Sequence, residues 1–157
     1  MDLSKAFDCI PHGLLLPKLK YYGTSKSALN LIQNYLSNRK QCVKLGTALS
    51  TWQDIYKGVP HVSISGPALF NIFINDIFYF ISDSSLCNYA DDNTLSYSGY
   101  DLDEIINTLE KDSFNLIDWF TSNQMKMNPD KFQAIAIGIN TQSKNISFNL
   151  NGNIKKT

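Results

Sequence analysis

The hydrophobic positions recur every three or four residues in three parts of the chain, which is the spacing of a buried helix face. These parts are residues 14–22, 29–36 and 102–120. A further predicted helix, within residues 67–81, is apolar nearly all round, so we expect it to be buried under a sheet. Ser25 and Asp101 stand just ahead of residues 29–36 and 102–120 and are the predicted N-caps of those helices.

Elsewhere apolar and polar residues alternate, and this period of two predicts strands. The predicted strands are residues 39–45, 49–56, 84–88, 93–98, 131–139 and 146–150. The first two form a hairpin closed at Gly46 and Thr47, and the next two form a hairpin closed at Asp91 and Asp92. Asn151-Gly152 is typical of a hairpin turn, but its second strand is not supplied. This order of elements predicts an α+β fold, an antiparallel sheet with helices packed on one face.

The tip of the second hairpin carries the strongest chemical signal. Asp91 and Asp92 tolerate the positive φ of a tight turn, and this property alone is enough to explain two aspartates at a turn. Two adjacent carboxylates also repel each other, and a bound divalent cation removes that conflict. Oxygen ligands indicate a hard ion such as Mg²⁺, which shares its shell with water and phosphate oxygens. Ordinary turn chemistry stays an alternative, whereas an EF-hand loop fits poorly because Leu95 occupies a ligand position.

Composition is that of a single globular domain, since the 157 residues are 43% hydrophobic and 18% charged. Fourteen Lys and Arg balance fourteen Asp and Glu, so no overall basic charge indicates nucleic acid, although a local groove can be basic on a neutral chain. The three scattered cysteines, Cys9, Cys42 and Cys87, favour a reducing intracellular compartment, cytoplasm or nucleus. The sequence shows no signal peptide and no membrane span, so no membrane partner is expected.

Four segments stand in a definite order along the chain. They are Asp2-Leu3-Ser4-Lys5-Ala6-Phe7-Asp8; Arg39-x-Gln41-x-Val43 with Gly58-Val59-Pro60 and Ser65-Gly66-Pro67-Ala68-Leu69-Phe70; Asn88-Tyr89-Ala90-Asp91-Asp92; and Met127-Asn128-Pro129-Asp130-Lys131-Phe132. In this order they resemble the palm motifs of reverse transcriptases, specifically those of non-LTR (LINE-type) retrotransposons. The resemblance covers nearly the whole chain. It implies a reverse transcriptase-like palm, present as one partial domain over residues 1–157.

The resemblance also implies roles for individual side chains. The catalytic carboxylates, which would hold two Mg²⁺ ions or Mn²⁺ in their place, are Asp2, Asp91 and Asp92. The nucleotide-binding residues would be Phe7, Pro60, His61 and Lys131. Phe7 would lie beneath the sugar and exclude a ribose 2′-OH, and Lys131 would lie near the triphosphate. Without the resemblance, Phe7 is equally well interpreted as a core residue. Asp2, His61 and Lys131 are then interpreted as solvated surface residues.

Two features depart from the family pattern. The family has Gln and then Gly after the loop proline, where this chain has His61 and Val62, and a β-branched Val resists the close backbone approach that Gly permits. Ser65 also replaces an aliphatic residue. In the family, basic fingers and the strand that presents Asp2 lie upstream, and the thumb lies beyond Thr157. We therefore expect a palm cut from a longer protein.

The resemblance implies an RNA-directed DNA polymerase, which transfers deoxynucleotides from their triphosphates to the 3′-OH of a DNA primer on an RNA template. We expect this piece to be inactive alone. The alternative is a non-catalytic remnant, a decayed or domesticated palm that at most binds nucleic acid or protein, and His61 with Val62 favours it. A cation-binding scaffold without nucleic acid would explain the neutral charge but not the ordered motifs.

Overall fold

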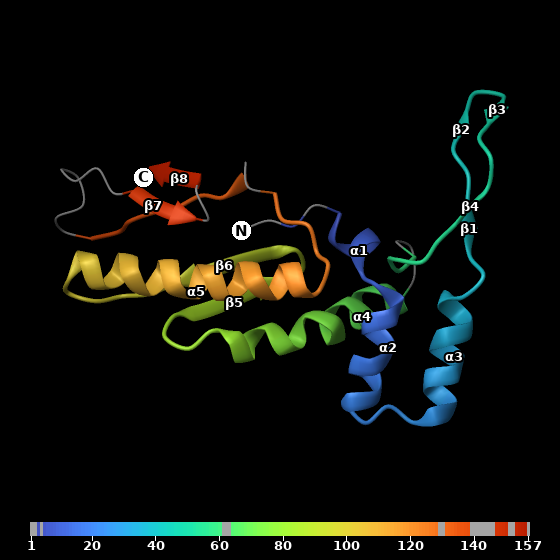
Figure 1. Cartoon of the computed structure of the whole chain (residues 1–157), viewed down its shortest axis with the longest axis horizontal. Coiled ribbons are helices and arrows are strands. Elements are labelled where there is room, and N and C mark those ends of the chain that lie inside the picture. Colours follow the sequence, from blue (N-terminus) through green and yellow to red (C-terminus); the bar gives the residue numbers. More distant parts are fainter. Residues whose placement is uncertain are drawn as a thin grey trace. The chain divides into compact units, whose positions relative to one another are not determined.

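The computed structural model describes residues 3, 5–60, 64–128, 131–138, 147–150 and 153–156. The chain folds into two compact units. The N-terminal unit is Lys5–Ile74, and the C-terminal unit is Met1–Ser4 together with Asn75–Thr157. Figure 1 shows the helices and strands of both units along the colour-coded chain. The single partial domain predicted over residues 1–157 stays a prediction.

Four helices build the N-terminal unit: α1 (Ala6–Cys9), α2 (His12–Tyr21), α3 (Lys26–Leu36) and α4 (Ser65–Ile74). The predicted N-cap of α3 is confirmed, because the Ser25 hydroxyl accepts a hydrogen bond from the amide of Ala28. Helix α2 contacts both α3 and α4. The buried side chains between these helices include Leu15, Leu19, Phe70 and Phe73. Within this unit α4 is therefore covered by a helix, and its predicted burial under a sheet stays a prediction.

A two-stranded ribbon spans residues 39–57 of the same unit. β1 (Lys40–Gln41) pairs with β4 (Gln53–Asp54), and β2 (Lys44–Leu45) pairs with β3 (Ala48–Leu49), both antiparallel. The turn at Gly46 and Thr47 is where the sequence predicted it, and Gly46 has the positive φ of 60° that glycine adopts readily. No residue of the ribbon is buried.

One long helix organises the C-terminal unit. α5 (Leu102–Ser122) contacts the 3₁₀-helix η1 (Asn75–Phe80), strand β6 (Asp92–Ser96) and strand β7 (Ser147–Leu150). Its predicted N-cap is confirmed, since Asp101 Oδ1 accepts a hydrogen bond from the amide of Asp103. Strand β5 (Ser85–Tyr89) pairs with β6, and β7 pairs with β8 (Asn153–Lys156). The core lies on one face of α5 and holds Leu116, Trp119, Phe120 and Ile77 of η1.

Two strand predictions need correction. The strand predicted over residues 131–139 pairs with no other strand among the residues described, although the exposure of its side chains alternates from Lys131 to Ala136. The hairpin said to lack its second strand has one, because β8 pairs with β7 from Ser147 opposite Lys156 to Leu150 opposite Asn153.

The described chain is thus a mixture of helices and four two-stranded antiparallel sheets, which agrees with the α+β class but not with one continuous sheet. Among the described residues, no helix combines the length and the apolar character that crossing a membrane requires.

Candidate active site

Asp91 and Asp92 lie at the end of the β5–β6 hairpin. The strands pair from Ser85 opposite Ser96 to Tyr89 opposite Asp92, so the turn consists of Ala90 and Asp91. The predicted tip is therefore shifted by one residue, and Asp92 is the first residue of β6. Ala90 takes the positive φ, 52°, which the sequence analysis assigned to the aspartates. An L residue other than Gly, Asn or Asp rarely adopts this conformation, so the surroundings must hold it.

Two asparagines hold this turn. Asn88 and Asn93 stand opposite each other in the strand register, and Asn88 Nδ2 donates to Asn93 Oδ1 at 2.9 Å. Asn88 Nδ2 also donates to the carbonyl oxygen of Ala90 at 3.0 Å, and Asn93 Nδ2 donates to that of Asp91 at 3.1 Å. Asn93 is buried, with 1% exposure. This amide clamp, formed by Asn88 and Asn93, binds both carbonyl groups of the turn and so fixes the backbone that carries the two carboxylates.

The two carboxylates are accessible to a cation. Asp91 is half-buried and Asp92 is exposed, and neither forms an ion pair with a residue that the structure describes. The consecutive residues Asp91 and Asp92 offer only oxygen ligands, which are the ligands that a hard cation prefers. Asp2, the third predicted ligand, lies outside the described residues, and among the described ones no group of three His, Cys, Asp or Glu side chains could hold a metal ion. The metal site therefore stays a prediction.

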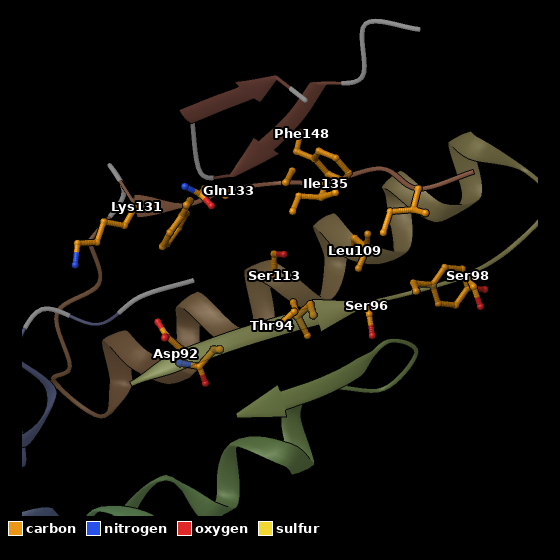
Figure 2. Close-up of a pocket in the computed structure, with 16 residues that line it drawn as sticks. Asp92, Thr94, Ser96, Ser98, Leu109, Ser113, Lys131, Gln133, Ile135 and Phe148 are labelled. Carbon is orange, nitrogen blue, oxygen red and sulfur yellow. The ribbon is translucent and has the colours of Figure 1, made fainter. Parts of the chain in front are cut away.

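A cavity of about 740 Å³ lies beside β6. It is bounded by β6, by Leu109 and Ser113 of α5, by residues 131–137 and by Phe148 of β7. Figure 2 shows Asp92 and Lys131 near one end of the cavity and Ser98 near the other. The structure thus brings Asp92 and the predicted nucleotide-binding residue Lys131 to the lining of one cavity. Lys131 itself is exposed.

A buried carboxylate anchors the start of the hairpin. Asp112 of α5 has 0% exposure and accepts hydrogen bonds from the amides of Ser82, Asp83 and Ser84 and from the Ser84 hydroxyl, the shortest at 2.7 Å. Burial by itself raises the pKa of Asp112, but the hydrogen bonds from Ser84, Asp83 and Ser82 outweigh it and hold the pKa below the usual 3.8. The anion therefore fixes the segment from which β5 begins.

In the N-terminal unit, the loop with the predicted nucleotide-binding Pro60 is bound to the segment that carries Phe7. The amide of Gly58 donates to the carbonyl oxygen of Ile10 at 2.7 Å, and the amide of Val59 donates to that of Phe7 at 2.9 Å. Gly58 has a φ of 84°, and a Cβ there would lie 2.9 Å from the backbone of Asp8. The close approach of these two segments therefore requires glycine.

His12 adds a side-chain contact to the same loop. Its ring nitrogen Nε2 lies 2.7 Å from the carbonyl oxygen of Gly58, 46 residues further along the chain. Phe7 is half-buried, and its ring centroid lies 4.7 Å from that of Phe70. Phe7 is therefore partly a packing residue, as its alternative reading held, and keeps an accessible part. Pro60 is half-buried, while His61 lies outside the described residues.

Comparison with known proteins decides the family. Residues 1–149 match the family model described as "Reverse transcriptase (RNA-dependent DNA polymerase)". The chain belongs to the reverse transcriptase family. Two relatives from Drosophila melanogaster agree with the predicted non-LTR retrotransposon type. "Probable RNA-directed DNA polymerase from transposon BS" is 31% identical over 144 residues, which is 83% of this chain. "Probable RNA-directed DNA polymerase from transposon X-element" is 30% identical over 107 residues, which is 62% of this chain.

This reverse transcriptase chain spans only 15% and 11% of the length of those two relatives.

The supporting residues of this reverse transcriptase domain were missed by the sequence analysis. Asp112 did leave a signal, because it is a polar residue at a helical position between the apolar Leu109 and Leu116. Asn88 and Asn93 also left one, since they flank the turn symmetrically and Asn favours local hydrogen bonds. His12 left none, because its partner is distant in sequence.

Proposed function

We propose that this chain supplies the carboxylate-bearing palm of an RNA-directed DNA polymerase. The observation that carries the proposal is the clamped turn, where Asp91 and Asp92 stand together without a cationic partner among the described residues. Two-metal nucleotidyl transfer needs adjacent carboxylates on a rigid element, and a turn with both carbonyl groups bound meets that need. Membership of the reverse transcriptase family supports this chemistry over simple turn chemistry.

Each site residue has a part in the proposal. Asp2, Asp91 and Asp92 would hold two Mg²⁺ ions, which when bound would stabilise charge on the attacking 3′-oxygen and on the leaving pyrophosphate. Lys131, exposed at the cavity that Asp92 also lines, would neutralise a phosphate or donate a proton.

In the N-terminal unit, Phe7, Pro60 and His61 would bind the nucleotide. Phe7 is suited to select a deoxyribose because its ring is held against Phe70.

The palm-like arrangement is part of the proposal, and the cavity beside β6 supports it. β6 pairs only with β5 among the described strands, and no backbone hydrogen bond joins residues 132–137 to the rest of the described chain. Leu3 forms an antiparallel bridge with Met127, which stands shortly before residues 131–137 in the sequence. The cavity of about 740 Å³ lies between β6 and residues 131–137, where a further strand would pair with the free edge of β6.

The partners of the proposed polymerase are an RNA template, a DNA primer and deoxynucleoside triphosphates, which would place it in the cytoplasm or nucleus. We expect no primer extension by residues 1–157 alone, since the chain spans only 15% and 11% of the relatives named for this activity. A primer-extension assay with Mg²⁺ and Mn²⁺ checks this expectation. Extension that is lost in Asp91→Asn/Asp92→Asn would show that this length suffices.

Metal binding is the direct test of the site. Titration calorimetry with Mn²⁺ should give a weak binding heat for the wild-type chain, because few ligands and no substrate phosphates are present. Asp91→Asn should remove that heat, whereas Asp118→Asn, an exposed carboxylate of α5, should leave it unchanged. Equal heats from wild type and Asp91→Asn would exclude Asp91 from the site and favour the alternative, a non-catalytic palm remnant.

A further inference from the structure

The total charge of the chain is zero because its two units carry opposite net charges. The N-terminal unit carries eight of the fourteen Lys and Arg side chains but only two of the fourteen acidic ones, Asp8 and Asp54, a net charge of +6. The C-terminal unit, with the remaining six cations and twelve acids, has a net charge of −6. A polyanion is therefore attracted to one unit and repelled by the other.

The two-stranded ribbon of residues 39–57 concentrates this positive charge. It carries Arg39, Lys40, Lys44 and Lys57 against the single acid Asp54. Lys40 lies 3.5 Å from Asp54, and both side chains are about half exposed. An exposed pair of this kind contributes little and does not prevent Lys40 from binding a phosphate. Arg39 donates to the carbonyl oxygen of Tyr35 and so ties the base of the ribbon to α3.

The ribbon also exposes large apolar and aromatic side chains. Trp52 is 65% exposed and Tyr56 is 74% exposed, and Val43, Leu45 and Leu49 are each at least 65% exposed. A two-stranded hairpin without a buried face is only marginally stable in water, and exposed apolar side chains of this kind mark an interaction surface. Figure 1 shows the ribbon as a narrow pair of strands that begins after α3.

We propose that this ribbon binds single-stranded nucleic acid, with Lys40 and Lys44 against phosphates and Trp52 and Tyr56 stacked on bases. Basic side chains interleaved with exposed aromatic ones are the usual means of binding a single strand without sequence preference. Lysine is depleted at protein–protein interfaces, whereas nucleic-acid interfaces are strongly positive. The charge of the ribbon therefore favours nucleic acid over a protein. The residues of this docking surface differ from those of the proposed metal site, and binding at the ribbon does not require a metal.

The test measures binding of a fluorescein-labelled oligouridylate to the full chain by anisotropy, with EDTA present. Each phosphate contact to a single strand contributes about −0.7 to the slope of log K against log salt. Lys40→Gln/Lys44→Gln should therefore make the slope shallower by about 1.4. The matched control Lys111→Gln/Lys126→Gln removes two exposed cations from the C-terminal unit and should leave the slope unchanged.

Tryptophan emission identifies the surface that is contacted. The chain has two tryptophans, and Trp119 is only 2% exposed, so quenching by a bound strand should report on Trp52. Trp52→Ala should weaken binding about 5- to 150-fold, because one base loses its stacking partner, and Trp52→Phe should largely restore the affinity.

Three results would overturn the proposal. The first is an equal change in the slope of log K against log salt in the ribbon variant and its control. The second is RNA binding without quenching of the Trp52 emission. The third is self-association, measured by sedimentation, that Trp52→Ala abolishes while the RNA affinity is unchanged. The last would assign the ribbon to a second copy of the chain. Because EDTA excludes divalent metal, none of these results bears on Asp91.

Discussion

Asn93→Ala should loosen the turn that presents Asp91 and Asp92. The Asn93 side chain accepts one hydrogen bond of the amide clamp at 2.9 Å and donates another at 3.1 Å. Its truncation leaves the Asp91 carbonyl oxygen without this donor and Asn88 Nδ2 with one acceptor fewer. A neutral hydrogen bond is worth about 1 kcal/mol net, and an unsatisfied buried group costs up to about 3 kcal/mol. Since Asn93 is 1% exposed, water replaces these bonds poorly, so the free energy of unfolding should fall by about 2–3 kcal/mol.

Ala90 provides an independent measure of the strain that the clamp holds. Its φ of 52° is left-handed, and this conformation costs an L residue about 1–2 kcal/mol. Ala90→Gly should remove the strain, partly offset by the greater backbone freedom that glycine loses on folding. We expect a net stabilisation of about 0.5–1 kcal/mol.

Urea unfolding followed by circular dichroism measures both changes, and amide hydrogen exchange at Asp91 and Asp92 locates them. The control is Asn71→Ala, which truncates an exposed asparagine of α4. A loss in Asn93→Ala no larger than in this control, with unchanged exchange at the turn, would show that the clamp does not hold the carboxylates. An unchanged Mn²⁺ heat in Asn93→Ala would show that metal binding does not need a fixed turn.

Further predictions concern the remaining supports of the site. Asp112→Asn should lower stability by about 1–3 kcal/mol, while the exposed Asp118→Asn on the same helix should not. Because the folded pKa of Asp112 is lowered, its contribution is present above about pH 3.8 and lost as the pH falls further, which thermal melts at several pH values can follow. Gly58→Ala should cost more than about 2 kcal/mol in urea unfolding, whereas Gly13→Ala, with open space in α2, should stabilise by up to about 1 kcal/mol. Strand-forming residues added ahead of the first residue should protect the amides of residues 132–137 from hydrogen exchange, and equal exchange with a Gly-Ser extension would argue against a strand site there.

Local sequence signals predicted local structure well. The caps at Ser25 and Asp101 and the turn at Gly46 are where the sequence placed them, because each depends on residues within one turn of helix or one hairpin. The turn at Asp91 was misplaced by one residue. The general preference of Asp for positive φ suggested Asp91 and Asp92 as the turn residues. The strand register, with Asn88 opposite Asn93, instead makes Ala90 and Asp91 the turn residues.

Contacts between distant residues could not be read from the sequence. The partner of His12 is 46 residues away, and that of Asp112 is 28 to 30 residues away. The strand over residues 131–139 was predicted from a local pattern, and the exposure of the side chains does alternate from Lys131 to Ala136. A strand is defined by a partner edge, however, and no partner stands beside these residues in the part of the chain that the structure describes.

The opposite charges of the two units predict that they bind nucleic acid under different conditions. The C-terminal unit, which contains Asp91 and Asp92, has an excess of six negative charges, and this excess opposes the approach of phosphate groups. Divalent cations reverse the local sign, so the same carboxylates that repel a phosphate when bare attract one when they hold a metal. The N-terminal unit needs no such switch, because its eight cations attract a nucleic acid under all conditions of moderate salt. Nucleic-acid affinity that is independent of metal should therefore belong to the ribbon, and affinity that rises with Mg²⁺ should belong to the carboxylate turn.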